Sequence, residues 1–201
     1  MTRSSQARRA EDSQEKAGLI THHRFTVEQY HRMGDLGLFR PEERVELIEG
    51  EVVEMSPIGA THASHVDRLN ALLSRRLAKL AIVRVQSPIM LNRRSEPQPD
   101  LTVLRPHPDY YSEHHPRPDD VWLVIEVSDS ARQYDRKVKL PLYARAGVRE
   151  VWIVDLIDAA IDIHRDPVGA WYRDVTPVQR GKRVSMQAFP KLVFRVNEIL
   201  G

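Results

Sequence analysis

The clearest helical pattern lies in residues 62–80, where apolar side chains recur at intervals of three and four residues. This spacing predicts one helix whose inward stripe consists of Val66, Leu69, Leu73, Leu77 and Leu80. His62 precedes Val66 by one helical turn and falls on the same stripe. The positions that project elsewhere give the helix a basic flank, and they are Arg68, Leu72, Arg75, Arg76 and Lys79.

Two elements are expected before this helix. Thr26 is a suitable cap for a short helix, which a glycine at position 34 or 37 can end. Two short apolar runs then flank Glu49-Gly50, and such a pair between apolar runs is typical of a β-hairpin.

The rest of the chain reads as strands around one more helix. Alternating or continuous apolar runs predict strands at 83–91, 99–104, 121–127, 149–155, 159–165 and 170–175. A helix is expected within 133–146. The strand at 121–127 is apolar on both faces, which is typical of a central strand. This order of elements predicts an α/β protein with a mixed central sheet.

Two of these strands carry a carboxylate where an apolar side chain is expected. Asp100 lies in "EPQPDLTVL", and Glu126 lies in "VWLVIEVSD" on the face that Trp122 and Val124 share. A buried carboxylate is costly unless it is paired or holds a cation. Neighbouring strands can bring the two acids together, and their repulsion then favours a metal ion between them. Taken singly, Asp100 fits an ordinary Pro-Asp turn, and Glu126 fits a solvated strand end equally well.

The segment "DRKVKLPLYARAGV" adds a candidate lysine for the same site. It presents two rows of side chains, an inward row of Val138, Leu142 and Ala146 and an adjacent row of Asp135, Lys139 and Tyr143. Pro141 requires that the regular helix begin just before it. Lys139 is then at the helix start, beside the strand end that carries Glu126. The ordinary interpretation of Lys139 is an exposed ion pair with Asp135, which contributes little.

Composition narrows the class of protein. The chain has 201 residues, of which 41% are hydrophobic and 29% charged, and this predicts one globular domain over 25–201 after a disordered tail at 1–24. The tail supplies the whole net charge of +2, so global charge does not indicate a nucleic-acid partner. The absence of Cys excludes disulfides and thiolate metal sites. No apolar run is long enough for a membrane and no secretory leader is visible, so we expect a cytoplasmic protein without a membrane partner.

With these elements in place, the sequence resembles the Uma-two family of candidate restriction endonucleases, a branch of the PD-(D/E)XK nuclease superfamily. The resemblance covers residues 25–165 and rests on "VELIEGEVVEMSPIGATHASHVDRLNALL", "QPDLTVL" and "VIEVSDSARQYDRKVKLPLYARAGVREVWIVD". It implies a restriction-endonuclease-like mixed central sheet flanked by helices, with an N-terminal helix plus hairpin and extra C-terminal strands. It also implies phosphodiester hydrolysis that depends on Mg²⁺ or Mn²⁺.

The resemblance also implies roles for individual residues. By position, Asp100 and Glu126 match the two metal-binding acids of the superfamily. The usual lysine lies two residues after the second acid, where this chain has Ser128. In this branch of the superfamily, a lysine on the following helix commonly takes the role of the usual lysine. Lys139 matches that position best. Candidates for supplementary contacts are His62, Lys137 and Gln98, although His62 is at least as well explained as a core histidine.

Three functions remain open from the sequence. The first, which we favour, is a metal-dependent endonuclease that acts on nucleic acid, DNA before RNA, and forms a homodimer. Its candidate phosphate contacts are weak ones, since each is more simply a solvated surface charge: Arg68, Arg75, Arg76, Lys79, Arg93 and Arg94. The second is a non-catalytic nuclease-fold module that binds nucleic acid or a protein, which Ser128 favours.

The third is a dimeric interaction protein that pairs through "EVWIVD" or the C-terminal strands. The loop "HPDYYSEHHP" has several histidines that can bind a transition metal. It shows no fixed ligand spacing, so we expect a solvated loop there.

Overall fold

Strand β5 (Val121–Ser128) is buried along nearly its whole length, because apolar side chains cover both of its faces. It lies inside a six-stranded mixed sheet with the order β3-β4-β5-β6-β7-β8. The pair β5–β6 is parallel, and every other neighbouring pair is antiparallel. The computed structural model describes residues 21–129 and 134–201, so most of the predicted tail at 1–24 lies outside the described residues.

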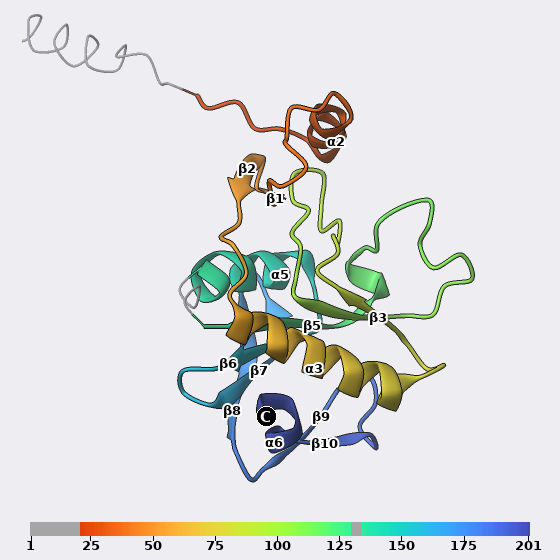
Figure 1. Ribbon diagram of the computed structural model, residues 1–201, viewed down its shortest axis with the longest axis vertical. Coiled ribbons are helices and arrows are strands. Elements are labelled where there is room, and N and C mark those ends of the chain that lie inside the picture. Colours follow the sequence, from red (N-terminus) through yellow and green to blue (C-terminus); the bar gives the residue numbers. More distant parts are fainter. Residues whose placement is uncertain (1–20, 130–133) are drawn as a thin grey trace, which may run out of the picture.

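The other strands of this sheet are β3 (Ile82–Val85), β4 (Leu101–Leu104), β6 (Glu150–Asp155), β7 (Ala160–Val168) and β8 (Trp171–Gln179). Helix α3 (Ala60–Leu77) packs on one face, where its apolar stripe meets side chains such as Leu101 and Ile125. Helix α5 (Leu140–Ala146) packs on the opposite face against side chains such as Val124 and Ile153. Figure 1 shows α3 crossing the sheet, with α6 (Val196–Leu200) and the pair β9 (Arg183–Ser185) and β10 (Val193–Arg195) beside it. The predicted α/β class with a mixed central sheet is confirmed.

The predicted stripe of α3 is confirmed at four positions and wrong at Leu80, and one residue of the predicted flank is wrong as well. Leu80 is 53% exposed, because the helix ends at Leu77 and Ala78 leaves the helical conformation with φ of 39°. Leu72, which we placed on the basic flank, is buried. The second correction follows from the breadth of the contact, since α3 packs both on the sheet and on α6.

The predicted hairpin is confirmed as β1 (Val45–Ile48) and β2 (Glu51–Glu54), joined by Glu49 and Gly50. Both turn residues have positive φ, 49° and 82°, as a tight hairpin turn requires. A side chain at position 50 would also collide with Arg24, whose Cβ would lie 2.7 Å away. The turn is thus encoded by the glycine.

Helix α2 (Val27–Asp35) begins where predicted, because Thr26 and Gln29 form a reciprocal capping box. The helix lies beside the hairpin and away from the central sheet (Figure 1). The Val27 N–H donates to the Arg93 carbonyl, and the Tyr30 hydroxyl donates to the Val45 carbonyl. These bonds fasten α2 to the hairpin and to the turn before β4.

Two strand predictions need correction. The strand expected at 83–91 ends at Val85, because Gln86 adopts a φ of 44° that no regular strand contains. Trp122 does not share a face with Val124 as expected. The register between β4 and β5 shifts near Val103, and Trp122 packs with the cluster on the α3 face instead.

The proposed dimer contact through "EVWIVD" is wrong. This stretch is β6, which pairs with β5 on one side and β7 on the other, so it has no free edge for a partner. The outermost strand on this side is β8, whose side chains are mostly exposed. None of the helices in the described ranges has the length and apolar character needed to cross a membrane.

Candidate active site

Asp100 and Glu126 meet at one end of two adjacent antiparallel strands. Leu101 of β4 is paired with Ile125 of β5, so the residues next to this pair lie side by side. The Asp100 N–H donates to Oε2 of Glu126 at 3.2 Å, and the Val127 N–H donates to Oδ2 of Asp100 at 2.9 Å. The expected meeting of the two acids is therefore present, and each carboxylate accepts a backbone N–H from the facing segment, Glu126 from Asp100 and Asp100 from Val127.

The helical segment after β5 begins with a wide turn. Residues Asp135–Lys139 form a π-helical turn, and regular α-helix starts at Leu140, directly before Pro141. Pro141 has no N–H to donate, which explains why the regular α-helical bonding cannot extend back through it. The predicted start of the helix before this proline is confirmed. Lys139 consequently lies at the junction, facing the strand ends.

The side chains of Asp135, Lys139 and Tyr143 are all buried. The alternative that Lys139 only forms an exposed ion pair on the helix surface is therefore wrong. Its side chain is 7% exposed, and Nζ lies 3.4 Å from Oε1 of Glu126 and 3.5 Å from Oε2 of Glu46. Burial opposes the charge on Lys139. The surrounding carboxylates outweigh burial and raise its pKa, so the amine keeps its proton.

Glu126 is the acid of this site whose pKa is raised furthest. It is 1% exposed, and the Tyr143 hydroxyl donates to its Oε1 at 2.6 Å. Burial raises the pKa of Glu126 to about 8, and the positive charge of Lys139 offsets only part of this rise. A carboxyl group that is still largely protonated at neutral pH can exchange its proton for a bound cation.

Glu46, which the sequence analysis did not select, is the third acid of the site. It comes from strand β1 and is fully buried. Its Oε2 accepts the Gln98 N–H at 3.0 Å, and its Oε1 accepts the Tyr134 hydroxyl at 3.0 Å. Alternation in the hairpin gives a signal for it, since Glu46 falls between apolar positions of a short strand whose other residues pack inward.

Asp135 is the fourth acid. It lies on the same helical row as Lys139, and burial raises its pKa to about 6 against the opposing charge of that lysine. Four carboxylates therefore surround one buried ammonium group, those of Glu46, Asp100, Glu126 and Asp135. This excess of negative charge in a buried site is the condition under which a protein gains from binding a cation.

His62 reaches the site from the first turn of α3, as its inward position predicts. Its Nε2 lies 2.8 Å from Oδ1 of Asp100, and the Gln86 side-chain amide donates to the same oxygen at 3.3 Å. The hydrogen bond to Asp100 raises the pKa of His62 despite partial burial. His62 therefore touches one of the acids, and its supplementary role in the site stays a prediction.

These side chains line a cavity of about 490 Å³ between the hairpin, the start of α3 and the strand ends. All four carboxylates, His62 and Lys139 lie on its wall, together with Arg44 and the segment 54–59. Asp100 and Glu126 offer oxygen donors, which suit Mg²⁺ and Mn²⁺, and Mg²⁺ typically takes one or two carboxylates and completes its shell with water and phosphate. The donor set therefore fits the expected cofactor.

The chain was compared with known proteins. A family model described as "Uma2: Putative restriction endonuclease" matches residues 27–197. This chain belongs to the Uma2 family. No curated protein sequence matches it. A crystal structure titled as "a putative nuclease belonging to DUF820" from Anabaena variabilis superimposes with a TM-score of 0.65 over 88% of this chain and 97% of the other, at 13% identity. This likeness shows a shared fold, and the family supports a nuclease function in general.

Some other residues that the sequence analysis selected do not present their side chains to the acids of the cavity. The Gln98 carbonyl accepts from Nζ of Lys139 at 3.4 Å, while its side chain turns away and donates to the Val45 carbonyl. Lys137 is exposed and does not line the cavity. Ser128 is buried at the end of β5. Lys139 is therefore the lysine that the fold brings to the acids.

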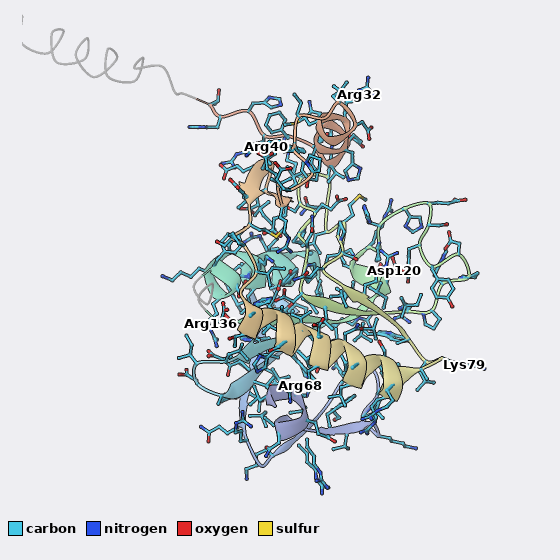
Figure 2. The ribbon with its side chains drawn as sticks, viewed as in Figure 1. Arg32, Arg40, Arg68, Lys79, Asp120 and Arg136 are labelled. Atoms are coloured by element: carbon cyan, nitrogen blue, oxygen red, sulfur yellow. The ribbon has the colours of Figure 1, made fainter. Side chains whose placement is uncertain are left out.

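The basic residues expected to contact phosphates do not form one surface. In Figure 2, Arg68 and Lys79 follow α3 away from the cavity. Arg76 donates to the Val193 carbonyl and lies over the Phe194 ring. Arg93 and Arg94 lie in the turn beside α2, on a different part of the molecule. Arg44, which was not selected, is the one arginine among the described residues that line the cavity.

Proposed function

We propose that this Uma2 protein is a metal-dependent endonuclease that hydrolyses phosphodiester bonds of nucleic acid at the cavity of Asp100, Glu126 and Lys139. The observation that carries this proposal is the meeting of four carboxylates around one buried, protonated lysine. A merely structural role would need one counter-charge for that lysine. Three further acids would then be an unexplained cost.

Asp100 and Glu126 are the residues that would hold the divalent ion, Mg²⁺ or Mn²⁺. Such an ion supplies a more acidic bound water and neutralises charge on the attacked phosphate. The backbone bonds from Asp100 to Glu126 and from Val127 to Asp100 fix the two carboxylates in position. Tyr143 fixes the remaining oxygen of Glu126, so the ligands are oriented before substrate arrives.

Lys139 keeps its proton at Nζ and presents it beside Oε1 of Glu126. There it stabilises negative charge that develops on the phosphate in the transition state. Glu46 and the Gln98 carbonyl hold the Lys139 ammonium group in place and leave its positive charge intact. His62 positions Asp100 through their hydrogen bond, and Arg44 supplies a second positive charge at the mouth of the cavity for the nucleic-acid backbone.

DNA is the proposed substrate, which the family's description as restriction endonucleases supports. The arginines and lysine of α3 are proposed as backbone contacts along its exposed flank, with Arg68, Arg75 and Lys79 the most accessible. A homodimer stays a prediction, for which strand β8 offers the exposed edge. Light scattering on the purified chain measures its mass directly.

The test is cleavage of plasmid, single-stranded DNA and RNA in Mg²⁺, Mn²⁺ or EDTA. We expect divalent-dependent cleavage that Glu126→Gln lowers at least about 100-fold, because the variant loses a charged ligand but keeps the shape of the side chain. The matched control is Glu49→Gln. Glu49 is an exposed acid on the hairpin turn, where it pairs with Arg145 of α5.

Cleavage that persists in Glu126→Gln would contradict the assignment of the site. Absence of cleavage, with retained binding of the same nucleic acids, would favour the non-catalytic module that Ser128 suggests. In that case the binding surface, and not the acid cavity, would carry the function.

A further inference from the structure

The cavity lined by Glu46, Asp100, Glu126 and Asp135 is called the acid cavity below. A second group of metal-ligating side chains lies apart from it. His31 of α2, Glu96 of the turn before β4, and His115 of the loop 105–117 each point a potential ligand atom to one place. These atoms all lie within 4.8 Å of one another, and Nε2 of His31 is 2.7 Å from Oε1 of Glu96. Within the described ranges this is the one group of three that meets this spacing.

Glu96 supplies an observation that points to a ligand. It is 2% exposed, and its Oε2 is buried with no hydrogen-bond partner among the described residues. A buried carboxylate oxygen without a partner is costly, and a bound cation is one of the few ways to satisfy it. The pairing of Glu96 with His31 uses only the other oxygen. An ordinary His–Glu hydrogen bond therefore leaves half of this carboxylate unexplained.

We propose that His31, Glu96 and His115 form a site for a borderline transition-metal ion, Zn²⁺ foremost. Two imidazole nitrogens and one carboxylate oxygen are the donors that Zn²⁺ prefers, and they differ from the all-oxygen set that suits Mg²⁺. Zn²⁺ binds such ligands at about 2.0–2.2 Å, so its ligand atoms lie about 3.3 Å apart in a tetrahedron. Ligand atoms that lie as far apart as 4.8 Å need to close by up to about 1.5 Å to reach this geometry, whereas His31 and Glu96 are already close enough.

The surroundings suit an exchangeable ion with one open position. Two cavities, of about 680 Å³ and about 480 Å³, are each lined by all three residues, so water can reach the ion from either side. The Glu96 backbone is fixed, since its N–H donates to the Leu47 carbonyl at 2.7 Å. Glu96 is thus held in place, and the two histidines approach it from helix α2 and from the loop 105–117.

Binding here would connect three parts of the chain, helix α2, the turn before β4 and the loop 105–117. Helix α2 lies away from the central sheet, and the loop 105–117 projects to one side of the molecule (Figure 1). An ion at this place joins both to the turn that leads into Asp100. The "HPDYYSEHHP" stretch then contributes one ligand, His115, instead of forming the solvated loop that its spacing predicts. This proposal does not depend on the nuclease activity.

The test is Zn²⁺ binding by the untagged full chain in competition with a chromogenic chelator, together with visible absorption of the Co²⁺-loaded protein. We expect one equivalent of tightly bound Zn²⁺, and weakening of at least about 100-fold in His115→Ala and in Glu96→Gln. His114→Ala is the matched control, because this neighbouring histidine is exposed and lies outside the group. Glu126→Gln should keep the Zn²⁺ affinity.

His115 is only partly buried, so its replacement should leave the fold intact, which thermal unfolding of the metal-free variant verifies. The proposal is overturned if the wild-type chain binds no stoichiometric Zn²⁺. It is equally overturned if His115→Ala binds Zn²⁺ as the wild type does, or if His114→Ala loses the ion to the same extent.

Discussion

Glu96 and Asp100 lie four residues apart on one segment, yet their carboxylates face different chemistry. Asp100 meets acids and a buried ammonium group, and its histidine neighbour touches it from a helix that packs on the sheet. Glu96 meets two histidines from peripheral segments and no lysine. The difference teaches that a carboxylate alone does not specify an ion. The surrounding donors decide whether a site suits a hard cation or a borderline one.

The two regions also differ in how they are built. The acid cavity is held by strand register and by a proline-defined helix start, and its central residues are buried. The histidine group depends on a short capped helix and a long loop. We therefore expect changes in the cavity to alter global stability, and changes near the histidines to act locally.

The largest effect on stability is expected for Lys139→Met. This change removes the only lysine that faces Glu46 and Glu126 at ion-pair distance in the described residues, and a buried acid without its partner costs about 3–5 kcal/mol of unfolding free energy. Urea unfolding in EDTA at pH 8 measures it. Lys137→Met, on the same turn but exposed, is the control and should stay within about 0.5 kcal/mol. Equal losses in both variants would remove the distinction between the two lysines.

The next effect is a fall in stability of the metal-free protein between pH 6.5 and 8.5. The pKa of Glu126 is raised to about 8 in the folded state, so the folded protein binds more protons than the unfolded chain in this window. Stability is then fully present below the unfolded pKa and is lost as pH rises toward 8. The raised pKa of His62 acts in the same direction.

Unfolding free energies in EDTA should fall by up to about 2 kcal/mol over that window. His164 acts in the opposite direction, because burial lowers its pKa to about 4, but most of its contribution is gained below its ordinary pKa of 6.5, at the start of the window. Glu126→Gln should flatten the curve. An unchanged slope in that variant would show that Glu126 does not hold the extra proton.

A smaller effect is expected for Tyr143→Phe, which keeps the ring but deletes the hydroxyl that donates to Glu126 at 2.6 Å. The buried oxygen loses one partner, at a cost of about 1–3 kcal/mol. Thermal unfolding in EDTA checks this. Tyr172→Phe, which removes a buried hydroxyl bonded to the Val148 carbonyl far from the acids, is the comparison variant. Only Tyr143→Phe should also change the pH dependence.

The smallest effect belongs to the histidine region. Thr26→Ala removes the side-chain cap of α2, which is worth about 1 kcal/mol. Because α2 carries His31, Zn²⁺ affinity should fall by about fivefold, while cleavage by the acid cavity stays unchanged. Chelator competition and the plasmid assay measure the two quantities. A matching loss of cleavage would mean that the two regions are coupled.

Much of the acid cavity could be predicted from the sequence, because local patterns determine it. Period two placed Asp100 and Glu126 at strand ends, and Pro141 fixed the start of the helix that carries Lys139. Alternation in its short strand signals only that Glu46 points inward, and Glu46 was missed because its place beside the other acids depends on how the hairpin docks against the 96–100 segment. The bulge that reverses Trp122 is likewise a property of pairing between strands.

The histidine group could not be predicted. His31, Glu96 and His115 are separated by 65 and 19 residues, and His115 lies in a loop without periodicity. Their meeting depends on how α2 docks against the rest of the chain. The Thr26 cap determines where α2 begins, but it does not determine where the helix docks. Only the three-dimensional arrangement shows that a loop histidine faces a buried glutamate.

The most direct test of the account is a double dissociation of the two ions. Mn²⁺ binding, followed by electron paramagnetic resonance, and Zn²⁺ binding, followed by chelator competition, are measured on wild type, Glu126→Gln and Glu96→Gln. The account predicts that Glu126→Gln loses Mn²⁺ and keeps the tight Zn²⁺, and that Glu96→Gln does the reverse. Loss of both ions in either folded variant, or of neither in both, would contradict it.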